Sequence, residues 1–310
     1  MRIAILGAGA VGSWVGGHLA LHGNDVHLLT TNSAHINAIR KNGLQLRKAD
    51  KSRRIEVPTS NPSEFKDTVD LVIVLTKTFQ LESALESIEG ILQGNTAVLT
   101  LQNGLGNGEI VARYAGAANT WVGLTMLPVD RIEPGVVEGK GEGGTWFGPF
   151  HGNSGALAED IENAFKPADI DVTYDPNVLV RIWQKVAFNA GMNAVCALTH
   201  STPGGINNSE FALEFVKSVA AEVAAVAEAE HVAIDLEAVY NTIDYACNNH
   251  GSHLPSMLQD LMNGRRTEVD ALNGAIVSRA GCAGIEAPLN KLLTGMLKLA
   301  EQGHRRDSST

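Results

Sequence analysis

Short runs of consecutive apolar residues alternate with longer stretches of helical length in the first third of the chain. A short run that is apolar at nearly every position is typical of a parallel strand buried on both faces. The runs are 2–6, 25–29, 70–75 and 97–101, and the helical stretches are 13–20, 34–41 and 81–92. This alternation predicts an α/β domain with a largely parallel sheet.

The pattern changes in the second half of the chain. Residues 121–148 combine glycines, a proline and short β-like runs, which predicts strands and turns that complete the first domain. Beyond residue 177 the alanine-rich sequence has the period of helices, and the polar tail 303–310 is expected to fray. The clearest helical segments are 211–230, 236–248 and 268–280. We therefore expect an α/β domain over residues 1–175 and an all-helical domain over residues 176–310.

A glycine motif directly follows the first apolar run. In a dinucleotide-binding turn, the first glycine permits a tight turn, the second lets the backbone approach the pyrophosphate, and the third lets the helix pack close to the strand. The sequence GAGAVG has this spacing between a strand-like run and a helical stretch, which is the context that such a motif requires. The motif predicts a Rossmann-type, doubly wound sheet with a cofactor site at Gly7, Ala8, Gly9, Ala10, Val11 and Gly12.

The residues after the second apolar run bear on the choice between NAD and NADP. An NAD site usually carries an acidic residue there, which bonds the ribose 2′-hydroxyl. Here the segment reads Thr30, Thr31, Asn32 and Ser33, so no carboxylate would repel a 2′-phosphate and several donors could bind one. No arginine stands there either, since Arg40 lies a helix away. We favour NADP, with Thr31 as a contact, and keep NAD as an alternative.

Composition and charge exclude several classes of function. The 310 residues include 24 Lys and Arg against 34 Asp and Glu, a net charge of −10, which disfavours binding to a nucleic-acid backbone. The apolar runs are far shorter than the ~18 residues that cross a bilayer. The N-terminus lacks the features of a signal peptide, so we expect a cytoplasmic protein.

Cysteine and histidine spacings give no support to a metal site. The three cysteines are far apart and outside any CxxC spacing, so we interpret them as small buried hydrophobic residues. One histidine pair, His18 and His22, has a ligand-like spacing, but it lies on the helix after the glycine motif and is more simply explained as surface.

Several polar residues stand where chemistry is plausible. Lys185, Asn189 and Asn193 share one face of a helix among apolar neighbours, so this stripe faces either water or a site. Lys77 and Asn103 follow the third and fourth apolar runs, at the strand ends where ligands bind in open α/β sheets. Helical geometry does not pair Ser256 with Glu268, because 12 residues place them about 120° apart.

Five motifs together resemble the ketopantoate reductase (2-dehydropantoate 2-reductase) family over essentially the whole chain. They are GAGAVG, LTKTFQ, LQNGLG, WQKVAFNAGMNAV and SMLQDLMNGRRTEVDALNG. The resemblance implies a Rossmann domain, a helical domain, and a cleft between them where the oxoacid meets the nicotinamide. It makes Lys185 the general acid and Glu268 the residue that orients the substrate and contacts the cofactor. It also implies substrate contacts for Asn189, Asn193 and Ser256, and cofactor-side contacts for Lys77 and Asn103, of which Asn103 would touch both ligands.

The resemblance implies NADPH-dependent reduction of 2-dehydropantoate to (R)-pantoate, a step of pantothenate and coenzyme A biosynthesis. The sequence departs from the family pattern in lacking a basic residue after the second strand and in carrying Pro255 and Pro203 at substrate-side positions. An NAD-dependent D-2-hydroxyacid dehydrogenase acting on another branched 2-oxoacid is therefore the main alternative, ahead of a non-catalytic dinucleotide sensor. An opine-type or glycerol-phosphate-type dehydrogenase would need a basic cluster that the sequence lacks. The partner we expect is a small anionic 2-oxoacid, and the apolar helices of the second domain leave a homodimer open.

Overall fold

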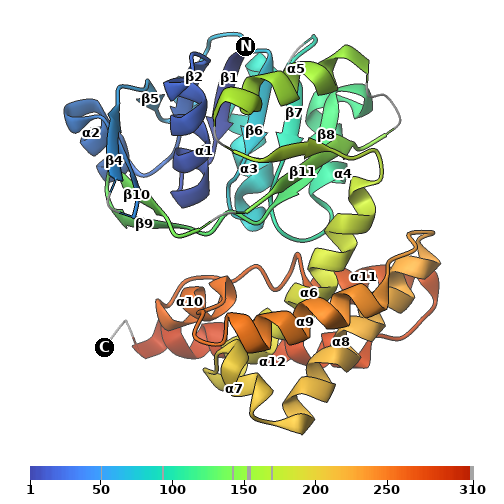
Figure 1. Ribbon diagram of the computed structural model, residues 1–310. Coiled ribbons are helices and arrows are strands. Elements are labelled where there is room, and N and C mark those ends of the chain that lie inside the picture. The colour runs from blue at the N-terminus through green and yellow to red at the C-terminus, as the bar shows by residue number, and fades with distance from the viewer. Residues whose placement is uncertain (50, 93, 142, 152–154, 169, 308–310) are drawn as a thin grey trace. The chain divides into compact units, whose positions relative to one another are not determined.

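The chain divides into an α/β unit and a helical unit. The computed structural model describes residues 1–49, 51–92, 94–141, 143–151, 155–168 and 170–307. The α/β unit comprises Met1–Gln102 and Asn107–Val178, and the helical unit comprises Asn103–Gly106 and Leu179–Thr310 (Figure 1). The α/β prediction for the N-terminal part and the helical prediction for the C-terminal part are both confirmed. The short segment 103–106 belongs with the helices, although it lies between two elements of the sheet unit.

The main sheet has eight strands, in the order β12-β11-β8-β7-β6-β1-β2-β5. Most neighbours run parallel, whereas β8 and β11 pair antiparallel. The order runs outward from β1 in both directions, which makes the sheet doubly wound with its switch point beside β1. The bounds are β1 (Arg2–Leu6), β2 (Asp25–Leu29), β5 (Thr59–Ser60), β6 (Leu71–Val74), β7 (Ala97–Thr100), β8 (Thr120–Thr125), β11 (Thr145–Pro149) and β12 (Val172–Tyr174).

Both faces of this sheet are covered, which explains why its central strands are apolar at nearly every position. In β1, Ile3 and Ile5 belong to one buried cluster, whereas Ala4 and Leu6 belong to the cluster on the opposite face. Helices α1 and α5 contribute to the first cluster, and α3 and α4 contribute to the second. The bounds are α1 (Ala10–Leu21), α2 (Ser33–Asn42), α3 (Leu81–Ser87), α4 (Asn107–Ala115) and α5 (Gly155–Phe165).

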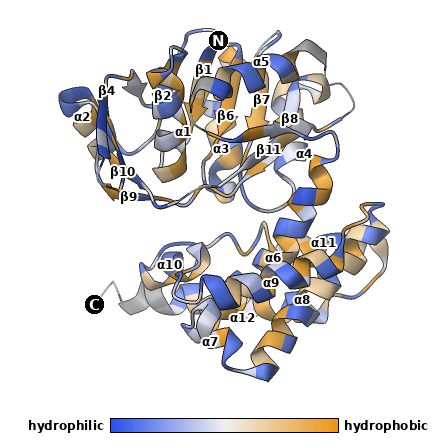
Figure 2. Ribbon diagram, in the orientation of Figure 1, coloured by the Kyte–Doolittle hydropathy of each residue, from blue (hydrophilic) through white to orange (hydrophobic). Residues whose placement is uncertain are grey.

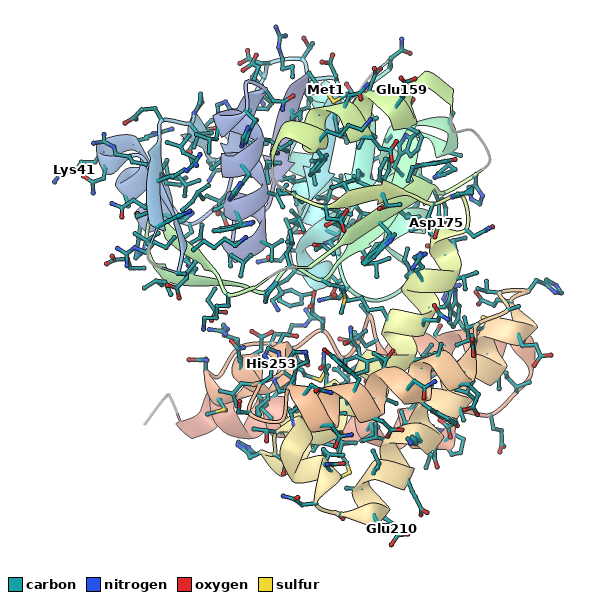
Figure 3. The ribbon with its side chains drawn as sticks, viewed as in Figure 1. Met1, Lys41, Glu159, Asp175, Glu210 and His253 are labelled. Atoms are coloured by element: carbon teal, nitrogen blue, oxygen red, sulfur yellow. The ribbon has the colours of Figure 1, made fainter. Side chains whose placement is uncertain are left out.

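A second, four-stranded sheet packs against α1. Its order is β4-β3-β10-β9, formed by β3 (Leu44–Lys48), β4 (Lys51–Ile55), β9 (Val129–Glu133) and β10 (Val136–Gly139). A side chain at Gly17 of α1 would meet Leu44 and Leu46, so the glycine lets helix and sheet approach closely. The edge strand β4 carries exposed Lys51, Arg53 and Arg54. Lys41, labelled in Figure 3, is exposed in the last turn of α2. Charge along an edge strand discourages pairing with another chain.

Two interpretations for the first half need correction, and one group of strands was not predicted. The helical stretch 81–92 forms a helix only to Ser87 and continues as a short 3-10 turn, Glu89–Ile91. The strands between residues 44 and 60 had no counterpart in the sequence pattern. His18 is half-buried rather than fully exposed, because its ring packs against Trp14 with centroids 4.5 Å apart and its Nδ1 lies 3.1 Å from a backbone oxygen. Among the described residues, no group of three or more His, Cys, Asp or Glu could hold a metal ion.

The helical unit surrounds one apolar core. Alanines and valines of α6 and α8 make up much of it, and in Figure 2 apolar residues alternate with polar ones along these helices. Within the described ranges, no helix is long and apolar enough to span a bilayer. The bounds are α6 (Val178–Thr199), α7 (Pro203–Asn207), α8 (Glu210–Ala229), α9 (Leu236–Asn249), α10 (Ser256–Met262), α11 (Asn273–Ala283) and α12 (Pro288–Asp307).

The structure also changes three expectations for the second half. The helix expected at 268–280 begins only at Asn273, so Glu268 lies in the turn before it. The tail expected to fray instead continues α12 to Asp307, and residues 308–310 lie outside the described ranges. Cys196 and Cys247 are buried as expected, whereas Cys282 is exposed.

Candidate active site

The glycine turn has a different steric requirement at each of its three glycines. Gly7 has a φ of +102°, and a side chain there would collide with the backbone of Thr76. A side chain at Gly12 would collide with the Gly7 carbonyl. At Gly9, by contrast, a Cβ atom would meet nothing nearer than the Gly7 oxygen, at 4.0 Å. The first and third glycines are therefore required by packing, and the second leaves open space in front of the backbone.

The N-terminus of α1 opens at this turn. Gly9 is its N-cap residue and has no side chain to cap the helix. The first backbone hydrogen bond of the helix runs from Ser13 N to Gly9 O and is 3.1 Å long. The N–H groups that precede Ser13 in the first turn therefore have no acceptor inside the helix. These N–H groups and the helix dipole suit an anionic group such as a pyrophosphate.

Lys77 lies on the other side of the sheet's switch point. It follows β6, the neighbour of β1 on the side away from β2, and directly precedes a short 3-10 turn. The backbone leading to it is fixed by Gln102, whose side-chain Nε2 donates to the carbonyl and the hydroxyl of Thr76, both at 2.9 Å. The ends of β1 and β6 thus present a glycine turn and a lysine where α/β sheets bind ligands.

Hydrogen bonds hold part of the segment between β2 and α2 in place. The Asn32 side-chain oxygen caps α2 by accepting the His35 N–H at 3.0 Å. Thr31 remains exposed. Arg40 donates from Nε to the Thr59 carbonyl at 2.9 Å, which ties its guanidinium to β5. The contribution of Thr31 to cofactor binding stays a prediction.

The polar stripe of α6 is not a solvated face. Asn189 and Asn193 are buried, and Lys185 is half-buried. Asn193 donates from Nδ2 to the Asn189 side-chain oxygen at 3.3 Å. Since buried amides without a structural role are costly, this arrangement favours the interpretation as a site.

Asn103 and Glu268 meet, although 165 residues separate them in the chain. The Asn103 side-chain Nδ2 donates to Glu268 Oε2 at 3.3 Å, and the backbone N–H of Leu105 donates to the Ala271 carbonyl at 2.9 Å. Gly104 has a φ of +84°, and a side chain there would collide with the same carbonyl. The 103–106 segment is therefore held tightly on the turn that carries Glu268.

The turn that carries Glu268 is itself anchored to the last helix. The backbone N–H and the hydroxyl of Thr267 both donate to the Glu301 carboxylate of α12, at 2.7 and 2.6 Å. Glu268 is only 7% exposed, which is rare for a carboxylate without a specific role. The sequence does not predict the pairing of Thr267 with Glu301, because this pairing depends on two segments that fold together.

Lys185 and Glu268 interact electrostatically. Burial lowers the pKa of Lys185 from 10.5 to about 8, while the Glu268 carboxylate acts in the opposite direction and raises it. A lysine in this range keeps its proton near neutral pH and can also release it. Asn103, Lys185 and Glu268 thus form a connected polar group around one titratable ammonium.

A buried amide network supports α6 next to the stripe. Asn273 donates from its side chain to the Ala190 carbonyl at 2.9 Å and to the Asn290 side-chain oxygen at 3.0 Å. Asn290 in turn donates from Nδ2 to Glu222 at 2.8 Å. Because every one of these groups comes from a different helix, the network ties α6 to α8, α11 and α12.

Ser256 is the remaining predicted site residue. It is exposed at the first position of α10, where Pro255 is the N-cap residue and gives no side-chain cap. Pro203 occupies the first position of α7, where a missing N–H costs nothing, and is buried. The substrate contact of Ser256 stays a prediction.

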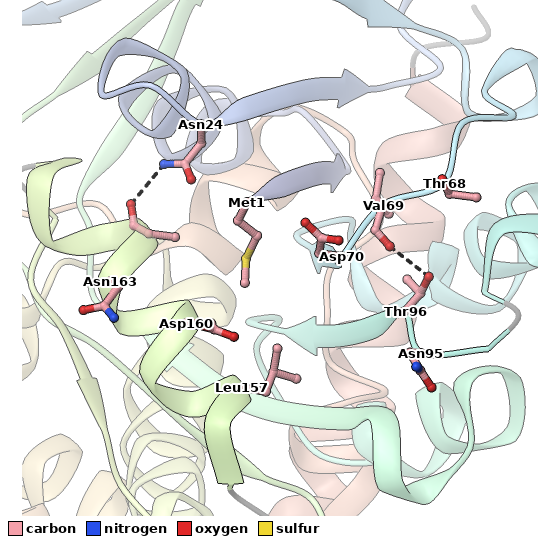
Figure 4. A pocket seen from close by; sticks show the side chains of 11 residues that line it. Met1, Asn24, Thr68, Val69, Asp70, Asn95, Thr96, Leu157, Asp160 and Asn163 are labelled. Carbon is pink, nitrogen blue, oxygen red and sulfur yellow. Dashed lines mark hydrogen bonds between the residues drawn. The ribbon is translucent and has the colours of Figure 1, made fainter.

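A cavity of about 680 Å³ lies in the α/β unit but contains none of the predicted site residues (Figure 4). Met1, Asn24, Asp70 and Thr96 come just before β1, β2, β6 and β7, so this cavity opens at the amino ends of the strands, opposite the glycine turn. Asn24 and Thr96 already donate to protein carbonyls. We assign no function to this cavity.

Comparison with known proteins agrees with the architecture. The sequence family described as "Ketopantoate reductase PanE/ApbA" matches residues 3–152, and "Ketopantoate reductase PanE/ApbA C terminal" matches residues 177–301. The 2-dehydropantoate 2-reductase of Streptococcus pyogenes serotype M6 is 33% identical over 302 residues, covering 97% of this chain and 98% of that protein. The enzyme of the same name from Halobacterium salinarum is 34% identical over 304 residues, covering 97% and 99%.

The chain therefore belongs to the ketopantoate reductase family. It is an oxidoreductase of the type that acts on a CH–OH group. Among solved structures, a D-mandelate dehydrogenase with NADH and anilino(oxo)acetate superimposes with a TM-score of 0.94 at 30% identity, covering 98% of this chain and 100% of that chain.

Proposed function

We propose that the protein reduces 2-dehydropantoate to (R)-pantoate, with Lys185 as general acid, in the biosynthesis of pantothenate and coenzyme A. The observation that carries this proposal is a half-buried lysine with a pKa of about 8 next to the buried carboxylate of Glu268. Reduction of a ketone leaves negative charge on the carbonyl oxygen, and a lysine with this pKa can donate a proton to that oxygen at neutral pH.

The amides of the site suit an anionic oxoacid. Asn189 and Asn193 add hydrogen-bond donors along the same helix face as Lys185, and donors of this kind can bind the substrate carboxylate in a protein with a net charge of −10. Glu268 keeps Lys185 protonated, and Asn103 fixes the Glu268 carboxylate. Ser256 is proposed as a further contact to the substrate.

The glycine turn fits a nicotinamide dinucleotide. Open space at Gly9 and the N–H groups of α1 would hold the pyrophosphate, with Lys77 and Thr31 as further contacts. The bound cofactor supplies the hydride for the substrate carbon. In this proposal residues 1–175 bind the cofactor and residues 176–310 supply the proton donor and the substrate contacts.

The preferred cofactor is NADPH, because the segment after β2 has no carboxylate to repel a 2′-phosphate. Two observations favour a second candidate, an NADH-dependent D-2-hydroxyacid dehydrogenase. The same segment lacks a basic residue, and two D-mandelate dehydrogenase structures with NADH, each 30% identical to this chain, superimpose with TM-scores of 0.94 and 0.91.

A substrate panel separates these candidates. Initial rates are measured by absorbance at the reduced nicotinamide band with 2-dehydropantoate, 2-oxoisovalerate, 2-oxoisocaproate and pyruvate, each with NADPH and with NADH. We expect the highest kcat/KM for 2-dehydropantoate with NADPH. A preference for another branched oxoacid with NADH would establish the second candidate, and a panel without turnover would refute both.

The pH dependence of the reaction provides a second test. Lys185 must be protonated to act as an acid, so kcat/KM for reduction should be constant at low pH and fall as pH rises through about 8. Glu268→Gln removes the charge that raises the pKa of Lys185, so the fall should begin at lower pH in this variant.

The matched control for this test is Glu286→Gln, which removes a carboxylate from an exposed position. Its profile should coincide with that of the wild type. If the Glu268→Gln profile also coincided with it, Lys185 would not be the group that sets the pH dependence.

A further inference from the structure

A chain of hydrogen bonds runs beneath the glycine turn through two fully buried polar side chains, Ser13 of α1 and His35 of α2. The backbone N–H of Gly135, in the turn between β9 and β10, donates to His35 Nδ1 at 2.9 Å. His35 Nε2 lies 2.9 Å from the Ser13 hydroxyl oxygen. The Ser13 hydroxyl donates to the Ala8 carbonyl at 3.3 Å.

The direction of every bond in this chain follows from its first donor. A backbone N–H can only donate, so His35 Nδ1 carries a lone pair and Nε2 carries the hydrogen. Nε2 therefore donates to the Ser13 oxygen, and the Ser13 hydrogen is directed to Ala8. Burial lowers the pKa of His35 to about 4, with a smaller contribution from Arg131 in the same direction, which agrees with a neutral ring.

The chain ends on the peptide that precedes Gly9. The carbonyl of that peptide accepts from Ser13, and its N–H, on Gly9, donates to the Gly7 carbonyl at 2.7 Å. The Ala8 N–H is also occupied, since it donates to Leu29 O at 2.9 Å. The Ser13 bond is thus one of two that set the plane of the peptide next to the open glycine.

We propose that Ser13 and His35 are positioning residues of the dinucleotide site, which hold the Ala8–Gly9 peptide in the orientation that keeps the space at Gly9 open to the pyrophosphate. This inference rests on the proposed use of the glycine turn for a dinucleotide. Neither residue touches the cofactor, and the effect passes through the Ala8 carbonyl. This chain of hydrogen bonds also connects α2 to the first turn of α1. Helix α2 begins in the segment after β2, where we expect the cofactor's ribose to bind.

Two substitutions of His35 separate positioning from simple structural support. In His35→Asn, the amide oxygen replaces Nδ1 and still accepts from Gly135, but the donor to Ser13 is lost. In His35→Gln, the amide nitrogen replaces Nε2 and still donates to Ser13, but the acceptor for Gly135 is lost. Each variant loses one buried hydrogen bond, so both should unfold at similarly lowered temperatures. Ser13→Ala removes the last link with almost no change in volume.

The experiment measures Kd for NADPH and NADH by fluorescence titration of the full chain, the Tm of each variant without cofactor, and kcat at saturating cofactor. We expect Ser13→Ala and His35→Asn to raise Kd about tenfold, the equivalent of one hydrogen bond. His35→Gln should raise it less than about threefold. The kcat values should stay close to that of the wild type. Ser218→Ala, which removes a serine-to-backbone bond in α8, should leave Kd unchanged.

Equal Kd values in His35→Asn and His35→Gln, or a Kd that follows Tm across the variants, would overturn the positioning role. An unchanged Kd in Ser13→Ala would do the same. A wild-type chain that binds neither NADPH nor NADH would refute the proposed cofactor site itself, which is a distinct outcome because it appears before any substitution is made.

Discussion

Replacement of Lys185 by alanine is expected to lower kcat for 2-oxoacid reduction by about 10²–10⁴-fold, the usual contribution of a positioned general acid. The substitution removes the ammonium whose pKa is lowered to about 8 and leaves Glu268 without its cationic neighbour. The glycine turn belongs to the other unit, so Kd for the dinucleotide should change little. Stopped-flow measurement of nicotinamide oxidation gives the rate of hydride transfer directly.

The control for this experiment is Lys291→Ala, which removes an exposed ammonium from α12. It should retain the wild-type rate. An unchanged hydride-transfer rate in Lys185→Ala would exclude Lys185 as the proton donor. A parallel loss of dinucleotide binding would instead indicate that the substitution disturbs more than the chemistry.

The second large effect is expected for Gly9→Ala, which should raise Kd for the dinucleotide on the order of 100-fold without destabilising the free protein. Gly9 has a φ of −82° and a ψ of −144°, so its φ lies outside the left-handed region that favours glycine, and the new methyl group would have its nearest neighbour at 4.0 Å. The methyl group would, however, occupy the space in which the backbone approaches a pyrophosphate. Kd is measured by fluorescence titration and stability by the Tm of the free protein.

Two further glycine variants control this prediction. Gly12→Ala should lower Tm, because its methyl group would collide with the Gly7 carbonyl. Gly281→Ala adds a methyl group inside α11 where nothing lies within 4 Å, so it should leave Kd unchanged and raise Tm slightly, because alanine is the better helix residue. A Gly9→Ala protein that binds the dinucleotide as tightly as the wild type would show that the open space serves another purpose.

Features with a strong local pattern could be predicted from the sequence. The glycine turn needs only a strand, three glycines and a helix in succession, and all of these lie within residues 2–21. The polar stripe of α6 could be found because Lys185, Asn189 and Asn193 recur at a helical period. Its burial could not be predicted, since it depends on helices that pack against α6 from far along the chain.

Strands β3 and β4 of the four-stranded sheet have no counterpart in the sequence pattern for a physical reason. β4 is exposed at every position except Ile55, and its charged residues give no alternation of apolar and polar positions. Glu268 was placed on a helix because its segment is polar and continuous with α11, although the turn that holds it is fixed by Thr267 and Glu301. The sequence gives no signal for Ser13 and His35 either. Their hydrogen bonds join α1, α2 and the turn between β9 and β10, which come together only in the folded protein.

The route of the chain between the two units limits how they could be exchanged among related enzymes. Residues Asn103–Gly106 group with the helical unit, while the chain on either side of them belongs to the α/β unit. In a chimaera with a single junction near residue 178, Gly104 and Leu105 would come from one parent and Ala271 from the other. The close contact of these residues with the Ala271 carbonyl would then join two different parents. An exchange of the helical unit between relatives therefore has to transfer the four-residue segment 103–106 together with the helices.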